Sequence, residues 1–212
     1  MGQNLWTMDG RPTGVSTLPW PLPDALELRD SLLAAYSDPH RGYHDVRHLA
    51  EVLERLGELT GAGTSYDRTP VLLAAWFHDA VYDGERDAEE RSAAWAEDAL
   101  PGVVGEAVVA EVARLVRLTE SHHPDDADAN GCALSDADLG ILAAPRTRYD
   151  EYVAAVRAEY RHLSDAVFRT GRADVLRELT AKPRLFHTAH GIAAWEDAAR
   201  KNVERELSAL VA

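Results

Sequence analysis

The stretch AAWFHDAVYD, residues 74–83, decides how this sequence is read, because a continuous apolar run ends there in an imidazole and two carboxylates. The run begins at Val71 and reads as a buried helix, and its last apolar residue, Phe77, is followed at once by His78 and Asp79. Such a pair is either hydrogen-bonded within a core or presented to a metal ion by the end of the helix. A metal site requires partners from elsewhere in the chain.

Helical periodicity continues on both sides of this stretch. Apolar residues recur at three- and four-residue steps within residues 41–59, and Asp24 is placed to cap a helix that ends near Tyr36. Further helices are expected over residues 69–83, 87–100, 103–120, 134–144, 146–162, 164–181 and 189–211. No run of alternating β-branched residues requires a strand. The sequence therefore predicts an all-α bundle of about eight to ten helices.

Length and charge limit the domain organisation and the partners. The 212 residues suffice for one core, with residues 1–23 as an irregular leader rich in proline and glycine and residues 24–212 as one helical domain. The formal net charge of −14 argues against binding to a nucleic-acid polymer or an anionic membrane. No secretory signal opens the chain, so the cytoplasm is the expected compartment, and a homodimer is the plain expectation for the assembly.

The chain has one cysteine, Cys132, and nine histidines, so any metal site would use nitrogen and oxygen ligands. His44 and His48 are four residues apart and would share one face of a helix. This pair is weak by itself, because no glutamate follows the first histidine as in zinc proteases. A histidine after an apolar run, such as His78, is also more often a core residue than a ligand.

Two further polar groups lie at expected helix ends. His122 and His123 end one helix, where the helix dipole alone would favour them, and Asp136 and Asp138 lie at the start of the next, where either a serine or an aspartate caps well. These side chains form a metal site only if the helix ends meet in space.

Taken in order, His48, His78-Asp79 and Asp138 resemble the H…HD…D signature of the HD superfamily of metal-dependent phosphohydrolases. The chain resembles more closely the bacterial family of predicted metal-dependent HD-superfamily phosphohydrolases. The matching stretches are YSDPHRGYHDVRHL (36–49), AAWFHDAVYD (74–83), EERSA (89–93), SDADLGIL (135–142), YDEYVAAVRAEY (149–160) and EDAARKN (196–202). They cover nearly all of the chain beyond the leader.

The resemblance implies an HD-type helical domain with a central metal site. Carried over residue by residue, it makes His48, His78, Asp79 and Asp138 the ligands of one divalent metal ion per chain, with Mn, Fe, Co, Ni, Mg and Zn as candidates. Such a set leaves coordination positions for water and a substrate oxygen. The implied activity is hydrolysis of a small phosphorylated compound, with nucleotides among the candidates, by metal-activated water.

Three side chains are candidates for proton transfer. HDAVYD also resembles the HDxxED stretch of guanosine tetraphosphate hydrolases in the same superfamily, with Tyr82 in place of the glutamate. Asp83 matches the final aspartate and could orient or deprotonate water, or simply be a helix-end carboxylate. Glu89 is a candidate acid or base, since Ala88 stands where the neighbouring family has asparagine. His44 could be a general acid or only a hydrogen-bond partner.

Arg41 and Tyr43 in HRGYH, and Arg157 in VRAEY, are candidate substrate-binding residues, because arginine offers a planar fork to phosphate oxygens. Arg157 could equally belong to an ion-pair network between helices. His122 and His123 raise the question of a second metal, since dinuclear members of the superfamily carry two more histidines before the last aspartate. Adjacent helical side chains diverge by ~100°, so at most one would face the cavity and a single metal is favoured.

Two other functions compete with hydrolysis. Some proteins of this fold use a di-iron pair to oxidise substrates with dioxygen, and these would also need extra histidine ligands. A non-catalytic ligand-sensing domain is the third reading, and the intact set of four candidate ligands makes it the weakest of the three.

Overall fold

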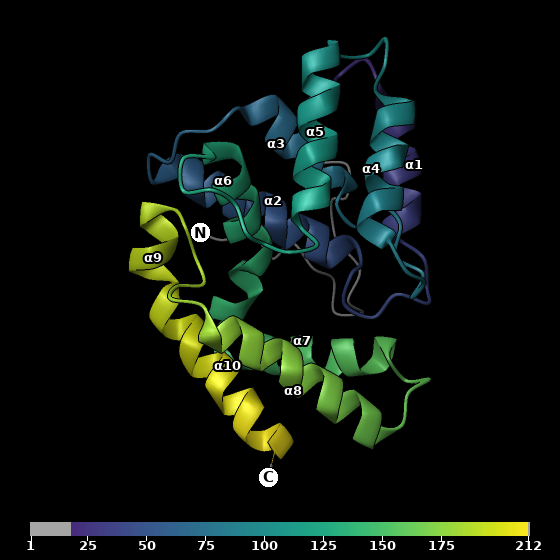
Figure 1. Ribbon diagram of the computed structural model, residues 1–212. Helices are drawn as coiled ribbons and strands as arrows, with labels where there is room; N and C mark the ends of the chain where they lie inside the picture. The colour runs from purple at the N-terminus through teal and green to yellow at the C-terminus, as the bar shows by residue number, and fades with distance from the viewer. Residues whose placement is uncertain (1–17, 212) are drawn as a thin grey trace.

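The computed structural model describes residues 18–211, and every regular element in that range is a helix (Figure 1). The elements are α1 (Leu26–Tyr36), α2 (Val46–Gly61), α3 (Arg68–Phe77), α4 (Ala88–Ala99), α5 (Glu106–Leu118), α6 (Ala129–Leu139), the 3-10 helix η2 (Gly140–Ala143), α7 (Arg146–Glu159), α8 (Asp165–Ala181), α9 (Ala189–Ala194) and α10 (Glu196–Val211). The predicted all-α bundle is confirmed. Within the described range, no helix has the length and apolarity needed to cross a bilayer.

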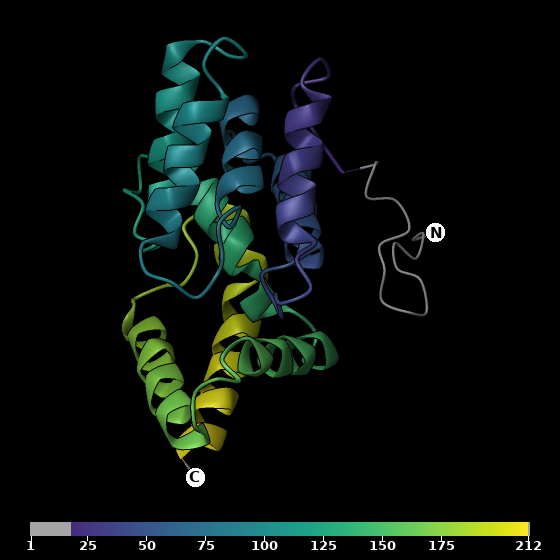
Figure 2. The ribbon, with the colours of Figure 1, turned by 90° about the vertical axis from the view of Figure 1, so that its right-hand side faces the viewer.

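The helices form two groups, seen one above the other in Figures 1 and 2. Helices α1 to α6 make the upper group, with α3 at its centre, in contact with α2, α4, α5 and α6. Every residue of α3 from Pro70 to Phe77 is buried, which confirms that the apolar run is a core helix. Helices α7, α8 and α10 make the lower group, and α6 and η2 lead from one group to the other.

Two helix boundaries near the candidate ligands differ from the sequence prediction. Helix α3 ends at Phe77 rather than near residue 83, so His78 and Asp79 lie in the turn that follows it. Helix α6 begins at Ala129, five residues before the predicted start at 134, because the Asp128 side chain caps it by accepting from the Gly131 N–H at 2.9 Å. Asp138 is consequently near the end of its helix, not at the start.

The prediction for the two ends of the chain also needs correction. The N-cap of α1 is Ala25 without a side-chain hydrogen bond, so Asp24 does not cap it. Residues 189–211 form two helices, since α9 stops at Ala194 and α10 starts at Glu196. Of the predicted leader, residues 1–17 lie outside the described range, and residues 18–23 are irregular, with Trp20 packed edge-on against Trp76 at a centroid distance of 5.0 Å.

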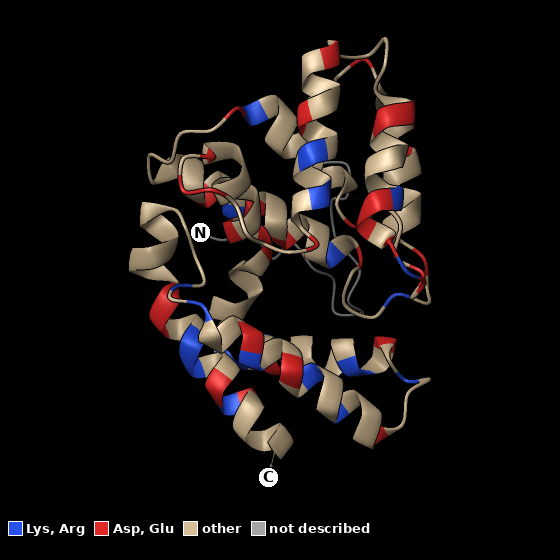
Figure 3. Ribbon diagram, in the orientation of Figure 1, with Lys and Arg blue, Asp and Glu red and all other residues tan. Residues whose placement is uncertain are grey.

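The lower group is held by ion pairs as well as by apolar contacts. Acidic and basic residues alternate along α8 and α10 in Figure 3. The most buried pair is Arg172 on α8 with Glu206 on α10, at 2.7 Å, and the hydroxyls of Tyr149 and Tyr152 on α7 bond to the same two side chains. This cluster fixes the three helices of the lower group against one another.

Candidate metal centre

His48 lies in the first turn of α2, where the Asp45 side chain sets the start of the helix. The carboxylate accepts from the backbone N–H groups of Arg47 at 2.8 Å and His48 at 3.2 Å, a standard N-cap. The His48 side chain is buried, with its ring centroid 4.7 Å from that of Tyr43. The cap therefore determines which residue of the helix faces the interior at this end.

His78 and Asp79 enter the interior from the turn that follows α3. The His78 N–H still bonds to the Ala74 carbonyl at 2.8 Å, and the Asp79 N–H donates to the Tyr36 hydroxyl at 3.2 Å. Tyr36 belongs to α1 and is fully buried, so α1 contributes to the placement of the pair. The last contributor is Asp138, the second-to-last residue of α6.

The donor atoms of these four residues converge. Nε2 of His48 lies 3.0 Å from Nε2 of His78, 3.2 Å from Oδ2 of Asp79 and 3.2 Å from Oδ1 of Asp138. Nε2 of His78 lies 3.0 Å from Oδ2 of Asp79 and 3.6 Å from Oδ1 of Asp138. His78 and Asp79 thus have partners on α2 and α6.

These separations fit the coordination sphere of one cation. Two donors ~2.1 Å from a shared ion are ~3.0 Å apart at a right angle and ~3.4 Å apart at the tetrahedral angle. Donor atoms of His48, His78 and Asp138 all lie within 4.8 Å of one another, and Asp79 contributes an oxygen beside both imidazoles. Two imidazoles and carboxylate oxygens suit Mn, Fe, Co, Ni and Zn, so the residues fit a divalent metal.

The hydrogen bonds around His78 fix the form that a metal ligand needs. Its Nδ1 donates to the Ala75 carbonyl at 2.8 Å, so the lone pair is on Nε2, which faces the other donor atoms. A second hydrogen bond of this type orients the ring and is a usual feature of histidine ligands. A histidine that only filled space in the core would not require its bare nitrogen to face two carboxylates.

The electrostatics of the cluster also favour a cation. Burial alone lowers the pKa of His48, but hydrogen bonds to Asp138 and Asp79 outweigh it and raise that pKa to about 10. Burial alone raises the pKa of Asp79 and of Asp138, but in the metal-free site the imidazoles lower both pKa values well below the usual range when they are protonated, first His78 and then His44 for Asp79 or His48 for Asp138. The two carboxylates therefore stay ionised and attract positive charge to this point.

His122 extends the cluster on the far side of Asp138, whereas His123 does not. Both histidines lie beyond Leu118, where α5 ends, so the prediction that they end a helix is wrong. Nε2 of His122 is 3.5 Å from Oδ2 of Asp138, and burial lowers the pKa of His122. His123 is exposed and its Nδ1 donates to the Ser121 carbonyl at 3.0 Å. Only one of the two faces the site, as predicted, but a turn at φ +48° causes this instead of helical geometry.

The loop before α2 places Arg41, Tyr43 and His44 beside the candidate metal centre. Arg41 donates to the carbonyls of His44 at 2.8 Å, Asp79 at 2.7 Å and Ala80 at 2.9 Å, so it ties backbone segments together and does not present the free fork expected for phosphate. Tyr43 is buried, and its hydroxyl has no hydrogen-bond partner among residues 18–211. Burial raises the pKa of Tyr43, with contributions from Tyr152 and Asp138.

Asp83 and Arg157 have partners away from the candidate metal centre, and Glu89 lies on α4. Asp83 is half-exposed and forms a two-pronged ion pair with Arg91 at 2.6 and 2.8 Å, which lowers the pKa of Asp83. Arg157 donates to Asp165 at 2.6 Å and to carbonyls in the α7–α8 connection. Glu89 is half-buried in the first turn of α4.

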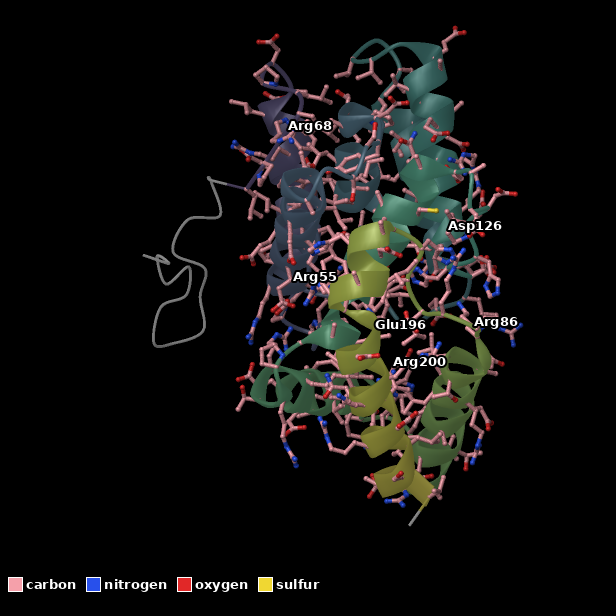
Figure 4. All side chains as sticks on the ribbon, turned by 90° about the vertical axis from the view of Figure 1, so that its left-hand side faces the viewer. Arg55, Arg68, Arg86, Asp126, Glu196 and Arg200 are labelled. Carbon is pink, nitrogen blue, oxygen red and sulfur yellow. The ribbon has the colours of Figure 1, made fainter. Side chains whose placement is uncertain are left out.

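Arg200, which lies in the EDAARKN stretch (196–202) of the family resemblance, also has partners within the fold. Figure 4 shows it beside Glu196 on α10, and its Nε donates to that carboxylate at 2.7 Å. It also donates to the Lys182 carbonyl at 3.0 Å, just past the end of α8. Its place in the fold is that of a helix-end ion pair.

Sequence reasoning missed the roles of Tyr36 and Glu159. Tyr36 was only an apolar residue at the end of a helix, yet its hydroxyl accepts from the Asp79 N–H. Glu159 lies near the VRAEY arginine without a role of its own in the sequence, but it binds the loop that carries His44, with 2.8 Å between its Oε2 and Nδ1 of His44. Both lie within the stretches that carry the family resemblance, which was the available signal.

No protein-family model, curated protein or solved structure matches this chain. The candidate metal centre is therefore defined by its own geometry.

Proposed function

We propose that this protein is a metal-dependent phosphohydrolase that acts on a small phosphorylated compound, with nucleotides as the first class to test. The observation that carries the proposal is the convergence of His48, His78, Asp79 and Asp138 at ligand-to-ligand separations of 3.0 to 3.6 Å. The order of these residues along the chain, which resembles the HD superfamily, supplies the reaction type.

The four side chains would fill only part of the coordination sphere of a divalent cation, which leaves positions for water and a substrate oxygen. An ion held there would supply a lowered pKa for its bound water and would offset the charge that develops on a phosphoryl oxygen. The buried hydroxyl of Tyr43 adds a hydrogen-bond donor next to the cluster, suited to a phosphate oxygen. Of the three predicted proton-transfer residues, His44 is the one that lies next to a proposed metal ligand. The ring centroids of His44 and His48 are 5.6 Å apart.

The test measures the metal content and the phosphatase activity of the same preparation. Protein purified without chelator should contain about one divalent metal per chain and should hydrolyse p-nitrophenyl phosphate or members of a nucleotide panel. His78→Ala and Asp79→Ala should each lose both properties. Turnover that survives in both variants would remove the metal centre from the reaction and end this proposal.

A di-iron oxidase is the second candidate, favoured by one observation. Oδ1 of Asp138 faces His48, whereas Oδ2 faces His122 at 3.5 Å, so one carboxylate addresses imidazoles on both sides. About two irons per chain, reduced to about one in His122→Ala and unchanged in His123→Ala, would support this candidate. One metal per chain in all three proteins would exclude it.

A further inference from the structure

Glu159, the last residue of α7, holds the loop that carries His44. Its Oε1 accepts three successive backbone N–H groups, from Gly42 at 3.0 Å, Tyr43 at 2.8 Å and His44 at 2.9 Å. Its Oε2 lies 2.8 Å from Nδ1 of the His44 ring. The side chain is 5% exposed, so these four hydrogen bonds account for the carboxylate.

The approach of the loop to α7 is close enough to require glycine at position 42. A Cβ atom there would lie 2.5 Å from the Ala155 carbonyl oxygen and 2.7 Å from Cγ of Glu159, both far inside van der Waals contact. The chain thus brings three backbone donors onto one carboxylate oxygen, and the other oxygen is left for the imidazole. The arrangement resists rotation of the carboxylate.

The His44 ring is also held on its faces and edges. Tyr82 stacks on it at a centroid distance of 3.9 Å and an interplanar angle of 25°, and Tyr43 meets it edge-on at 4.9 Å. The ring remains 22% exposed. Since a carboxylate only accepts hydrogen bonds, Nδ1 must carry the proton, and Nε2 is then the nitrogen with the free lone pair.

We propose that Glu159 is a positioning residue that fixes His44 as the Nδ1–H tautomer, so that Nε2 can take a proton from water or a substrate hydroxyl at the rim of the metal centre. In that step an O–H bond of the donor breaks, an N–H bond forms at Nε2, and the resulting imidazolium is paired with the Glu159 carboxylate. The proton later passes from Nε2 to the leaving oxygen. The catalytic part of this inference rests on the proposed hydrolase function, whereas the tautomer does not.

The tautomer is tested in metal-free protein by long-range ¹H–¹⁵N spectra of ¹⁵N-histidine-labelled samples, at about pH 9, above the ordinary imidazole pKa of ~6.5. The His44 signals are identified by their loss in His44→Asn. The wild type should carry the proton on Nδ1. In Glu159→Gln the amide oxygen can keep the three backbone donors, while its NH₂ group donates to Nδ1, so the proton should move to Nε2.

A second histidine–glutamate pair provides a matched control. Nε2 of His190 lies 2.8 Å from Oε1 of Glu58, and the His190 side chain is 24% exposed, close to the value for His44. His190 should therefore carry its proton on Nε2, and Glu58→Gln should change the His190 signals and leave those of His44 in place. A His44 proton on Nε2 in the wild type would overturn the inference, even if Glu159→Gln fails to fold. An unchanged tautomer in folded Glu159→Gln would also overturn it.

Activity provides the catalytic part of the test. With p-nitrophenyl phosphate and Mn²⁺, Glu159→Gln should lower kcat by about 100-fold or more, with KM and the metal content unchanged, the size usual for loss of acid–base catalysis. An unchanged kcat would overturn the catalytic part. If the wild type hydrolyses no phosphate ester while the tautomer result holds, the proposed function fails and the positioning role stands.

Discussion

Two buried polar clusters, one in each group of helices, differ in how their polar atoms are matched. In the lower cluster Arg172 donates to both oxygens of Glu206, at 2.7 and 3.1 Å, and to the Tyr152 hydroxyl at 2.7 Å, while Tyr149 donates to Glu206 at 2.6 Å. Every one of these contacts joins a donor to an acceptor. The lower cluster therefore needs nothing from outside the chain.

The candidate metal centre has the opposite arrangement. Nε2 of His78 carries a lone pair, as its Nδ1 proton is used by a carbonyl, and it faces carboxylate oxygens of Asp79 and Asp138 and another imidazole. Acceptors that face acceptors are stable only with a proton or a cation between them. Burial and charge therefore do not distinguish a structural cluster from a binding site, whereas the balance of hydrogen-bond donors and acceptors does.

Removing one partner of the lower cluster should produce the largest loss of stability. Glu206→Ala leaves the Arg172 guanidinium buried and unpaired, which should cost about 3–5 kcal/mol in the free energy of unfolding measured with urea. Metal content should not change. The double variant Arg172→Met with Glu206→Leu should recover most of the loss, because apolar groups of similar volume replace the pair; no recovery would mean that the cluster has a role beyond packing.

In the candidate metal centre, the main effect of Asp138→Asn should be a lower affinity for divalent metal ions. Loss of the ligand charge should weaken binding of Mn²⁺ or Zn²⁺ by more than about 100-fold, since changes outside the ligand shell already cost ~10–100-fold. Competition with a metal-sensitive dye measures this. Asp136→Asn, two residues away on α6, is the control. Asp136 accepts from the N–H groups of His187 and Thr188, so this variant should have a lower melting temperature but the metal affinity of the wild type. Equal affinities of the two variants would contradict the assignment.

The pH dependence of the metal-free protein sharpens the comparison further. The pKa of His48 is raised to about 10 in the folded protein, against ~6.5 for an unfolded chain. The stabilising contribution of His48 is thus complete below about pH 6.5 and declines as the pH rises from there toward the folded-state pKa of about 10. The melting temperature should fall between about pH 6.5 and pH 9 without metal, while the rise caused by added metal should grow, because binding releases protons. Asp138→Asn should flatten both trends, and a level wild-type curve would count against the pairing.

The smallest effect is expected at an exposed ion pair. Arg157→Ala removes contacts with Asp165, whose side chain is 84% exposed, so the free energy of unfolding should change by less than about 1 kcal/mol. Metal affinity and phosphatase KM should stay at wild-type values. A raised KM would restore the substrate-binding role that the sequence suggested for Arg157.

The sequence predicted most of the fold, because the apolar periodicity of the helices is a local property. The buried α3 followed from one continuous run, and the punctuation by proline and glycine separated most of the other helices. The prediction from periodicity failed at Asp128, whose side chain caps α6 several residues before the predicted start. It also failed at Trp195, where the apolar periodicity continues although α9 ends and α10 begins.

The metal ligands could be proposed from the order of residues in the chain, but their surroundings could not. Glu159 lies 115 positions from His44, and nothing in the spacing indicates that a helix end will meet that loop. Likewise, Asp79 and Asp83 both follow α3, and only the fold shows that Asp83 pairs with Arg91. Long-range pairing of this kind depends on tertiary packing.

The three hydrogen bonds of Arg41 bear on how far the chain would have to reorganise to bind an ion. They join the loop before α2 to the turn after α3 through protein atoms alone, so the two segments that carry His48 and Asp79 are held in register before any cation arrives. Little ordering entropy is then lost on loading, and chelators should extract the ion from a chain that stays folded. An ion bound there could then be exchanged without unfolding, so the identity of the ion would depend on supply as much as on the chain.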